Sequence, residues 1–237
     1  MTTDIHIRGK LGMQVFELFA GLPVETTNPF TICVNTGDGS DTSYHNRLGE
    51  LFDYDLDIID IGGMDKQKSW TPSAINKIFE KRGRIMSLLK LKENDDYVQM
   101  NNILHMRGKD KAVATPSAYL PVANEIAREH TLWILSDDSK YTGAVVLSLQ
   151  LNQSLDKNIK FNVSQQNDID DWYSILYAKE IWGCMSTFTL STLVVNPDKK
   201  INLFGKLYND GPYILTEENY QAVEALMTWC PNVTWID

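Results

Sequence analysis

The sequence predicts an α/β protein built from parallel sheets with helical covers and arranged in two halves. Short apolar segments rich in β-branched residues alternate along the 237-residue chain with longer segments whose apolar positions recur at helical spacing. A charged stretch, Lys92–Asp96, interrupts this alternation near the middle of the chain. We therefore predict an N-terminal domain at 1–95 and a C-terminal domain at 96–237.

In the first half, three short apolar runs have the composition of strands, and they lie at 5–8, 31–35 and 58–61. The first run is followed by a glycine-containing turn, Gly9–Gly12, and then by an apolar helical pattern. This order is typical of the start of a nucleotide-binding unit, and a tight turn that needs a flexible backbone explains it equally well. Further helices are expected after capping residues, at 43–52 and 71–81.

The second half repeats the alternation. Apolar runs typical of strands lie at 103–107, 132–135, 160–161, 180–184 and 201–204. Segments with helical spacing and capping or acidic residues at their starts lie at 117–129, 168–178, 186–195 and 216–228. The apolar stretch Tyr141–Leu151 fits both a strand and a helix.

The composition narrows the class of protein. A hydrophobic content of 43% and a charged content of 22% are those of a globular protein, and a net charge of −9 argues against a nucleic-acid partner. No apolar run is long enough for a membrane span, and the polar N-terminus does not resemble a signal peptide. Three cysteines without metal-ligand spacing indicate reduced thiols. We expect a cytoplasmic protein.

The most informative stretch is His105–Lys111, which follows an apolar run and holds an imidazole, a carboxylate and three cations, Arg107, Lys109 and Lys111. Cations at the end of a buried strand are costly to desolvate unless an anion is bound there. An acidic protein that binds phosphate must concentrate its few cations locally. This stretch therefore predicts an anion site.

Four stretches resemble, in order, the motifs of the fucosyltransferase superfamily. His105–Lys111 is similar to its His-x-Arg-Arg-x-Asp-Lys motif, with Gly108 at the second arginine. Ser136–Asp138 is similar to a Ser/Thr-Asp-Asp motif, and Ser186–Thr189 resembles Ser-Thr-Phe-Ser at a helix start. Gly9–Phe16 is similar to Gly-x-Leu-Gly-Asn-Gln-x-Phe, with methionine in place of the asparagine.

The resemblance implies a GT-B fold of two Rossmann-like halves and a metal-independent, inverting transfer of L-fucose to a glycan hydroxyl. The donor, usually GDP-fucose, would bind the C-terminal half, and the acceptor would lie against the N-terminal half. No metal or cofactor is implied. The chain is short for a two-domain enzyme of this type, which suggests a bacterial or virus-encoded setting. Asp55-Leu56-Asp57 has the form of a metal motif, but it precedes a predicted strand, so we place it on the surface.

The resemblance also implies roles for single residues. Arg107 would grip the diphosphate, because a guanidinium is always charged and pairs with phosphate bidentately. The donor-binding residues would be Gly9, Gly12, His105, Arg107, Lys109, Lys111, Asp137, Asp138, Ser186, Thr187 and Phe188. An inverting reaction needs a base for the acceptor proton, and Asp38, Asp41 and Asp110 are the candidates.

Each of these residues also has a purely structural interpretation. Arg107 could form an ion pair with Asp110 or Asp137, His105 could be a satisfied buried histidine, and Ser186 could be an ordinary helix cap. The aspartates could be solvated turn residues. Gly108 removes one cation from the motif, so another donor, such as UDP- or GDP-rhamnose, is an alternative. A non-catalytic nucleotide- or glycan-binding module and a plain α/β protein with chance matches are the others.

Overall fold

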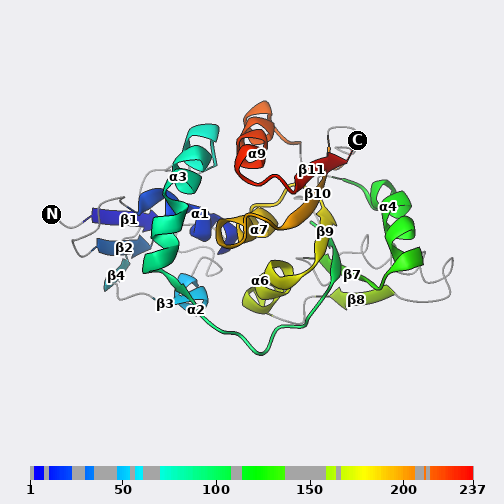
Figure 1. Ribbon diagram of the computed structural model, residues 1–237, viewed down its shortest axis with the longest axis horizontal. Helices are drawn as coiled ribbons and strands as arrows, with labels where there is room; N and C mark the ends of the chain where they lie inside the picture. The colour runs from blue at the N-terminus through cyan, green and yellow to red at the C-terminus, as the bar shows by residue number, and fades with distance from the viewer. Residues whose placement is uncertain are drawn as a thin grey trace. The chain divides into compact units, whose positions relative to one another are not determined.

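A computed structural model of the 237-residue chain (Figure 1) describes residues 3–7, 11–22, 30–34, 47–53, 57–60, 70–107, 114–136, 159–163, 167–205, 211 and 214–236. The chain forms two compact units. Unit 1 contains Met1–Glu93 and Glu217–Trp229, and unit 2 contains Asn94–Thr216 and Cys230–Asp237. The predicted boundaries did not include the return of a C-terminal segment to the first unit.

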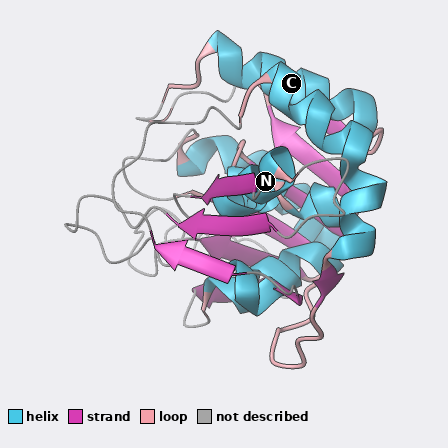
Figure 2. Cartoon of the chain, turned by 90° about the vertical axis from the view of Figure 1, so that its left-hand side faces the viewer, coloured by secondary structure: helices cyan, strands magenta, loops and turns pink. Residues whose placement is uncertain are grey.

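The sheet of unit 1 has three parallel strands in the order β1-β2-β4. They are β1 (Thr3–Ile7), β2 (Phe30–Val34) and β4 (Asp57–Asp60), and Figure 2 shows them side by side and pointing the same way. The strands predicted at 5–8, 31–35 and 58–61 each overlap with one of these three. Consecutive parallel strands need a connection that crosses the sheet, and helices supply it in such folds.

The helices of unit 1 begin with α1 (Leu11–Gly21), which packs against β1. Because α1 begins at Leu11, Gly12 is helical and not part of a turn, which corrects the predicted Gly9–Gly12 turn. Helix α2 (Leu48–Leu51) is a single turn, and α3 (Pro72–Leu88) continues well beyond the predicted end at residue 81. A two-residue ribbon joins β3 (Phe52–Asp53) to β5 (Lys90–Leu91).

Helix α9 (Glu217–Trp229) belongs to unit 1 although it lies near the C-terminus of the chain. It packs against α3, where the rings of Phe79 and Trp229 stack with centroids 6.2 Å apart. The indole Nε1 of Trp229 also donates to Oδ1 of Asn76 over 2.9 Å. An aromatic contact and a hydrogen bond therefore fasten the end of α9 to unit 1.

The sheet of unit 2 has six strands in the order β11-β10-β9-β6-β7-β8, and every pairing is parallel. The strands are β6 (Asn102–Met106), β7 (Leu132–Ser136), β8 (Ile159–Val163), β9 (Glu180–Gly183), β10 (Lys200–Phe204) and β11 (Val233–Ile236). The sequence did not predict β11. Strand β6 is buried along its whole length, as expected for a central strand of a parallel sheet.

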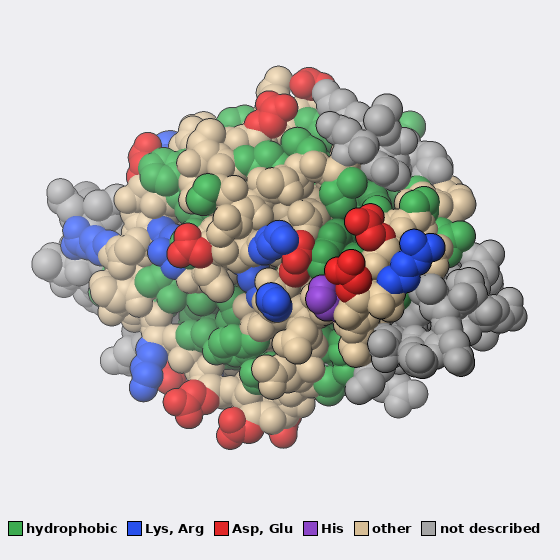
Figure 3. All heavy atoms as spheres, turned by 45° about the vertical axis from the view of Figure 1, so that its right-hand side comes forward, with side chains coloured by type: hydrophobic (Ala, Val, Ile, Leu, Met, Phe, Trp, Pro, Cys, Tyr) green, Lys and Arg blue, Asp and Glu red, His purple; other side chains and the backbone are tan. Residues whose placement is uncertain are grey.

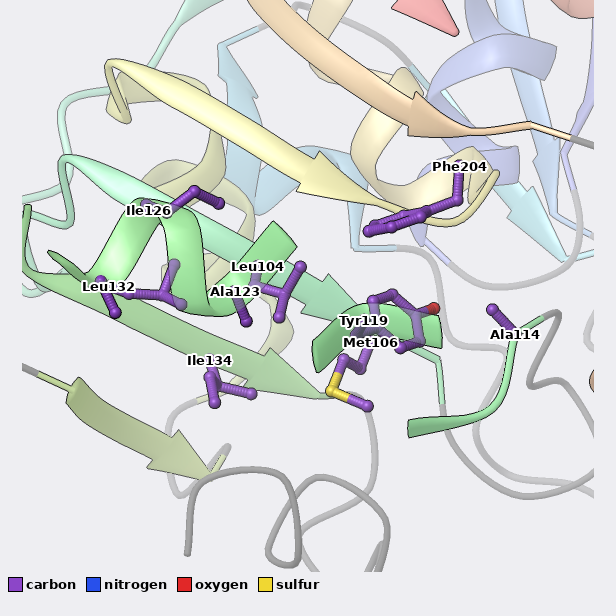
Figure 4. Packing of buried hydrophobic residues seen from close by; sticks show 10 residues of the cluster. Leu104, Met106, Ala114, Tyr119, Ala123, Ile126, Leu132, Ile134 and Phe204 are labelled. Atoms are coloured by element: carbon purple, nitrogen blue, oxygen red, sulfur yellow. The ribbon is translucent and has the colours of Figure 1, made fainter. Parts of the chain in front are cut away.

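Helix α4 (Pro116–Glu129) packs its apolar side against one face of this sheet. In Figure 4, Leu104 and Met106 of β6 lie beside α4, and the ring of Tyr119 meets that of Phe204 edge to face, with centroids 4.7 Å apart. Three further helices, packed against one another, are α6 (Asp168–Tyr177), α7 (Thr187–Leu190) and α8 (Thr192–Val195). The predicted helix at 186–195 is thus two short helices that meet at Ser191.

The predicted fold class, α/β with parallel sheets and helical covers, is confirmed by these pairings. The stretch Tyr141–Leu151, left open between strand and helix, lies outside the described residues. Among the helices that the structure describes, none combines the length and apolarity that a membrane crossing needs.

Candidate functional site

Among the residues singled out in the second half, those that the structure describes lie at the carboxyl ends of the strands of unit 2. Because all strands of this sheet are parallel, their carboxyl ends lie along one edge, which is where open α/β sheets bind ligands. His105 is the penultimate residue of β6, and Arg107 directly follows that strand. Ser136 is the last residue of β7, and Ser186 lies three residues after β9.

His105 is buried, with only 2% of its surface exposed. Side chains alternate between the two faces of a strand, so His105 faces away from the α4 core that Leu104 and Met106 enter. Its Nδ1 lies 2.7 Å from Oγ1 of Thr189 in α7, within hydrogen-bond distance. Its ring also contacts Phe188, with centroids 6.1 Å apart. Two of the predicted motifs, 84 residues apart in the chain, therefore touch at this point.

The close approach of β6 and β9 depends on Gly183, which pairs with His105 in the register of the two strands. A Cβ atom at position 183 would lie 2.5 Å from the carbonyl oxygen of His105 and 3.3 Å from its carbonyl carbon. Both atoms are backbone, so they cannot move aside without displacing β6. A residue without a side chain at position 183 is therefore a condition for the observed place of His105.

The single turn α7 is held in place by side chains from its own end and from α6. The indole Nε1 of Trp172 donates to Oγ of Ser191 over 2.9 Å, and Ser191 Oγ donates to the carbonyl oxygen of Phe188 over 2.8 Å. Thr192 Oγ1 donates to the carbonyl oxygen of Thr189 over 2.7 Å. These bonds satisfy carbonyl groups at the break between α7 and α8, and they fix the backbone of Phe188 and Thr189.

Ser186 occupies the position before α7, but its hydroxyl makes no capping hydrogen bond. This corrects the prediction that Ser186 caps the helix. The side chain is 1% exposed, and its Oγ has no hydrogen-bond partner among the residues that the structure describes. A buried hydroxyl without a partner is costly, so native structures rarely keep one unless it serves another purpose.

Arg107 lies at the same edge of the sheet and is partly exposed. It follows β6 instead of ending it, because the strand stops at Met106 and not at the predicted residue 107. Thr187 and Phe188, the other predicted donor-binding residues of this stretch, are the first two residues of α7 and are half-buried. The described part of this edge thus contains a guanidinium, an imidazole and a hydroxyl, groups that can donate hydrogen bonds to an anion.

The remaining predicted residues lie in unit 1 or outside the described part of the chain. Gly12 lies in unit 1, buried in the first turn of α1. Asp57, the end of the Asp-x-Asp stretch, is the first residue of β4. Lying outside the described residues are Gly9, Asp38, Asp41, Lys109, Asp110, Lys111, Asp137 and Asp138. Within the described part of the chain, no three His, Cys, Asp or Glu side chains converge in a way that could hold a metal ion.

Two residues of the site were not assigned a role from the sequence, Gly183 and Thr189. Thr189 is the last residue of the Ser-Thr-Phe-Thr stretch, so the motif contained it, but a contact over 84 positions leaves no local pattern. Gly183 follows the apolar pair Ile181-Trp182, and a glycine late in a strand is a signal for close backbone approach. That signal was present in the sequence and could have been used.

Comparisons with known proteins give little further information. No family model matches the chain, and no curated protein does. The crystal structure of Acinetobacter baumannii MurG is similar to this chain with a TM-score of 0.43 and 11% sequence identity, over 100% of this chain and 85% of that chain. A likeness of this degree supports no statement about what the protein binds.

Proposed function

We propose that the protein is a metal-independent, inverting glycosyltransferase of the GT-B type that moves L-fucose from GDP-fucose to a glycan hydroxyl. The resemblance of four sequence stretches to the fucosyltransferase motifs suggests this activity. The observation that carries the proposal is the 2.7 Å contact between His105 and Thr189, because it joins two of those stretches at the carboxyl edge of one parallel sheet.

The chemistry requires a site for a diphosphate that gains negative charge as its bond to the sugar breaks. In the proposed reaction the acceptor oxygen forms a bond to C1 of fucose on the face opposite the leaving group, and GDP departs. Arg107 supplies a permanent positive charge for the diphosphate, and His105 and Ser186 supply neutral hydrogen-bond donors. The buried hydroxyl of Ser186, which no described residue engages, supports this assignment because a ligand would satisfy it.

The proton of the acceptor hydroxyl goes to a base, and a carboxylate suits that role. Asp38, Asp41 and Asp110 remain the candidates, and all three lie outside the described residues. The other donor-binding residues that we propose are Lys109, Lys111, Asp137 and Asp138. Lys109 or Lys111 would restore the positive charge that Gly108 removes from the motif.

Gly108 also keeps a second donor in consideration. With one arginine fewer than the motif, the diphosphate clamp would fit a different nucleotide or deoxysugar, such as UDP- or GDP-rhamnose.

Slow release of free sugar from the correct donor, without acceptor, distinguishes an enzyme from a module that only binds nucleotide. Donor binding without any release would support the module.

The test of the proposal is the exchange Arg107→Ala, compared with Arg128→Ala as a control of equal charge. Arg128 lies in the last turn of α4 and is exposed, at the opposite end of the strands from Arg107. We expect Arg107→Ala to lower sugar release from GDP-fucose at least about 100-fold, since removing one transition-state donor costs that much in other enzymes. Arg128→Ala should keep the activity. Equal activity in both variants would refute the proposed role of Arg107.

A further inference from the structure

The hydrogen bond between His105 and Thr189 determines more than the position of the imidazole ring. Both side chains are 2% exposed, so water does not compensate for a missing partner at either one. The two atoms in contact, Nδ1 of His105 and Oγ1 of Thr189, lie 2.7 Å apart. Either atom could be the donor, and the choice between them fixes which nitrogen of the imidazole carries the proton.

The hydroxyl of Thr189 settles this choice. It carries one hydrogen, and within the described residues Nδ1 of His105 is the group with which this hydroxyl is in hydrogen-bond contact. If Nδ1 carried a proton and donated, the hydrogen of Thr189 would lack an acceptor in a buried place. If Thr189 donates, both atoms are satisfied. The second arrangement requires Nδ1 to be unprotonated, which places the proton of the neutral ring on Nε2.

The backbone around Thr189 keeps the hydroxyl where it can make this bond. The carbonyl oxygen of Thr189 accepts from Thr192 Oγ1, and the preceding carbonyl accepts from Ser191 Oγ. Trp172 in turn donates to Ser191 from α6. On the other strand, the missing side chain at Gly183 lets β6 approach closely enough for His105 to reach α7. Both partners are thus held by groups outside the pair.

We propose that Thr189 is a positioning residue that holds His105 as the neutral tautomer protonated on Nε2. What this tautomer means for donor binding rests on the proposed function. In that site His105 offers an N–H group to an anionic oxygen of the donor, and it does not act as the base that takes the proton of the acceptor hydroxyl. A base would need an unprotonated Nε2, and Thr189 opposes that state. The base must therefore be another group, which agrees with a carboxylate.

The first test measures the tautomer directly, without any ligand. Proton–nitrogen NMR of the full chain with 15N-labelled histidine distinguishes the two ring nitrogens. The exchange His105→Gln identifies the signals of His105 among those of the four histidines. In the unsubstituted protein we expect the protonated nitrogen of His105 to be Nε2. Detection of the proton on Nδ1 would overturn the inference, whatever the protein binds.

Two substitutions separate the hydroxyl from the packing of the side chain. Thr189→Val keeps the shape and removes the hydroxyl, so Nδ1 loses its donor and a mixture of tautomers is expected. Thr189→Ser keeps the hydroxyl and should keep the Nε2-protonated form. An unchanged tautomer in the valine variant would contradict the proposal. Because the unsubstituted protein gives the primary result, poor folding of the valine variant would not remove the test.

The consequence for donor binding is measured separately by titration with GDP. Loss of one hydrogen bond to a charged group is worth about a tenfold change in affinity. We expect Thr189→Val to bind GDP about tenfold more weakly and Thr189→Ser to match the unsubstituted protein. If Nε2 is protonated and the unsubstituted protein binds no nucleotide sugar, the proposed function fails while the tautomer assignment stands. If GDP binds equally well to the valine variant, the role of Thr189 in donor binding is refuted.

Discussion

At the scale of single residues, the place of His105 depends on an atom that is absent. The carbonyl oxygen of His105 lies only 2.5 Å from the point where a Cβ of residue 183 would be. The imidazole can reach Thr189 only if β6 and β9 keep this separation. The donor site that we propose is thus sensitive to a change of one methyl group in the neighbouring strand.

We predict that Gly183→Ala destabilises the protein by about 2–4 kcal/mol, because the added methyl group forces two paired strands apart. Gly83→Ala is the matched control. Gly83 lies in α3, and a Cβ there would meet no atom within 4 Å. Alanine is a better helix former, so the control should gain about 0.5–1 kcal/mol. Denaturant unfolding measures both, and equal stability of the two variants would show that the strands tolerate the side chain.

In each unit a lysine donates to carbonyl groups at the end of a helix, and of the two Lys81 is half-buried and Lys199 is buried. Lys81 Nζ donates to the carbonyl oxygens of Ala20 and Leu22 at the end of α1, and Lys199 Nζ donates to that of Leu176 near the end of α6. These carbonyl groups have no partner within their helix, and a cation there also complements the helix dipole. Burial nevertheless lowers the pKa of Lys81, as does the charge of Lys77. It lowers the pKa of Lys199 to about 8.

Lys199 makes the stability of the protein depend on pH in a defined window. Its folded-state pKa of about 8 is below the ordinary lysine value, so the unfolded chain holds the proton more tightly. The free energy of unfolding should therefore rise as the pH increases from about 8 to about 10, by on the order of 2–3 kcal/mol. Lys199→Met should remove this rise. Lys200→Met, at an exposed neighbour, should retain it. Urea unfolding at a series of pH values measures the effect, and parallel curves for the protein and Lys199→Met would contradict it.

At the scale of elements, α7 is too short to be stable by itself. A single turn forms few internal hydrogen bonds, so its order depends on the side chains around it. Those contacts come from Trp172, Ser191 and Thr192. The side chain of Trp172 is fully buried. The short helix thus has its geometry imposed by α6 and α8.

We predict that Trp172→Phe loosens α7. Phenylalanine keeps an aromatic ring but has no N–H group, so Ser191 loses a buried donor, and the smaller ring leaves a gap. The expected loss of stability is about 1–3 kcal/mol. Hydrogen exchange should be faster at the amides of Leu190 and Ser191, which donate to Ser186 and Thr187. Trp229→Phe, at an exposed indole of unit 1, should leave those amides unchanged. Unchanged exchange in Trp172→Phe would show that α7 does not depend on the indole.

Most elements could be predicted from the sequence because an element with one buried face carries apolar residues at a regular spacing. The strands of the two parallel sheets are short apolar runs, and α6 begins with acidic residues, as expected. The Asn167 cap before them was not predicted. Helix α3 was predicted to end at residue 81, but it continues through Gly83 to Leu88, because an isolated glycine is tolerated within a long amphipathic helix. Strand β11 was missed because four residues at a sheet edge give a weak signal.

The features that could not be predicted are those decided by contacts far apart in the chain. The place of α9 in unit 1 follows from its packing against α3, and no local pattern encodes it. The same holds for the break at Ser191, where Trp172 supplies the partner that makes a helix end favourable. For the site, the sequence placed His105 and Ser186 near strand ends, where the structure also has them. The contact of His105 with Thr189, and the Ser186 hydroxyl that no described residue engages, could be seen only in the structure.

At the scale of the whole molecule, the protein is acidic. On the face drawn in Figure 3, acidic and basic side chains are interspersed among apolar and neutral ones. With a net charge of −9, an anionic ligand is not attracted by the protein as a whole. Binding of a nucleotide sugar must then rely on local groups, and Arg107 with its neighbours at the carboxyl edge of unit 2 is the local arrangement that we propose for this purpose.

The most direct test of this account is the melting temperature of the protein with GDP, UDP and ATP, each with and without magnesium. We predict that GDP raises it by about 5–10 °C at a concentration 100 times its dissociation constant, that magnesium has no influence, and that Arg107→Ala abolishes the shift. UDP and ATP should leave the melting temperature unchanged. No shift with GDP, or an equal shift with all three nucleotides, would contradict the claim that unit 2 holds a guanosine diphosphate sugar at the end of β6.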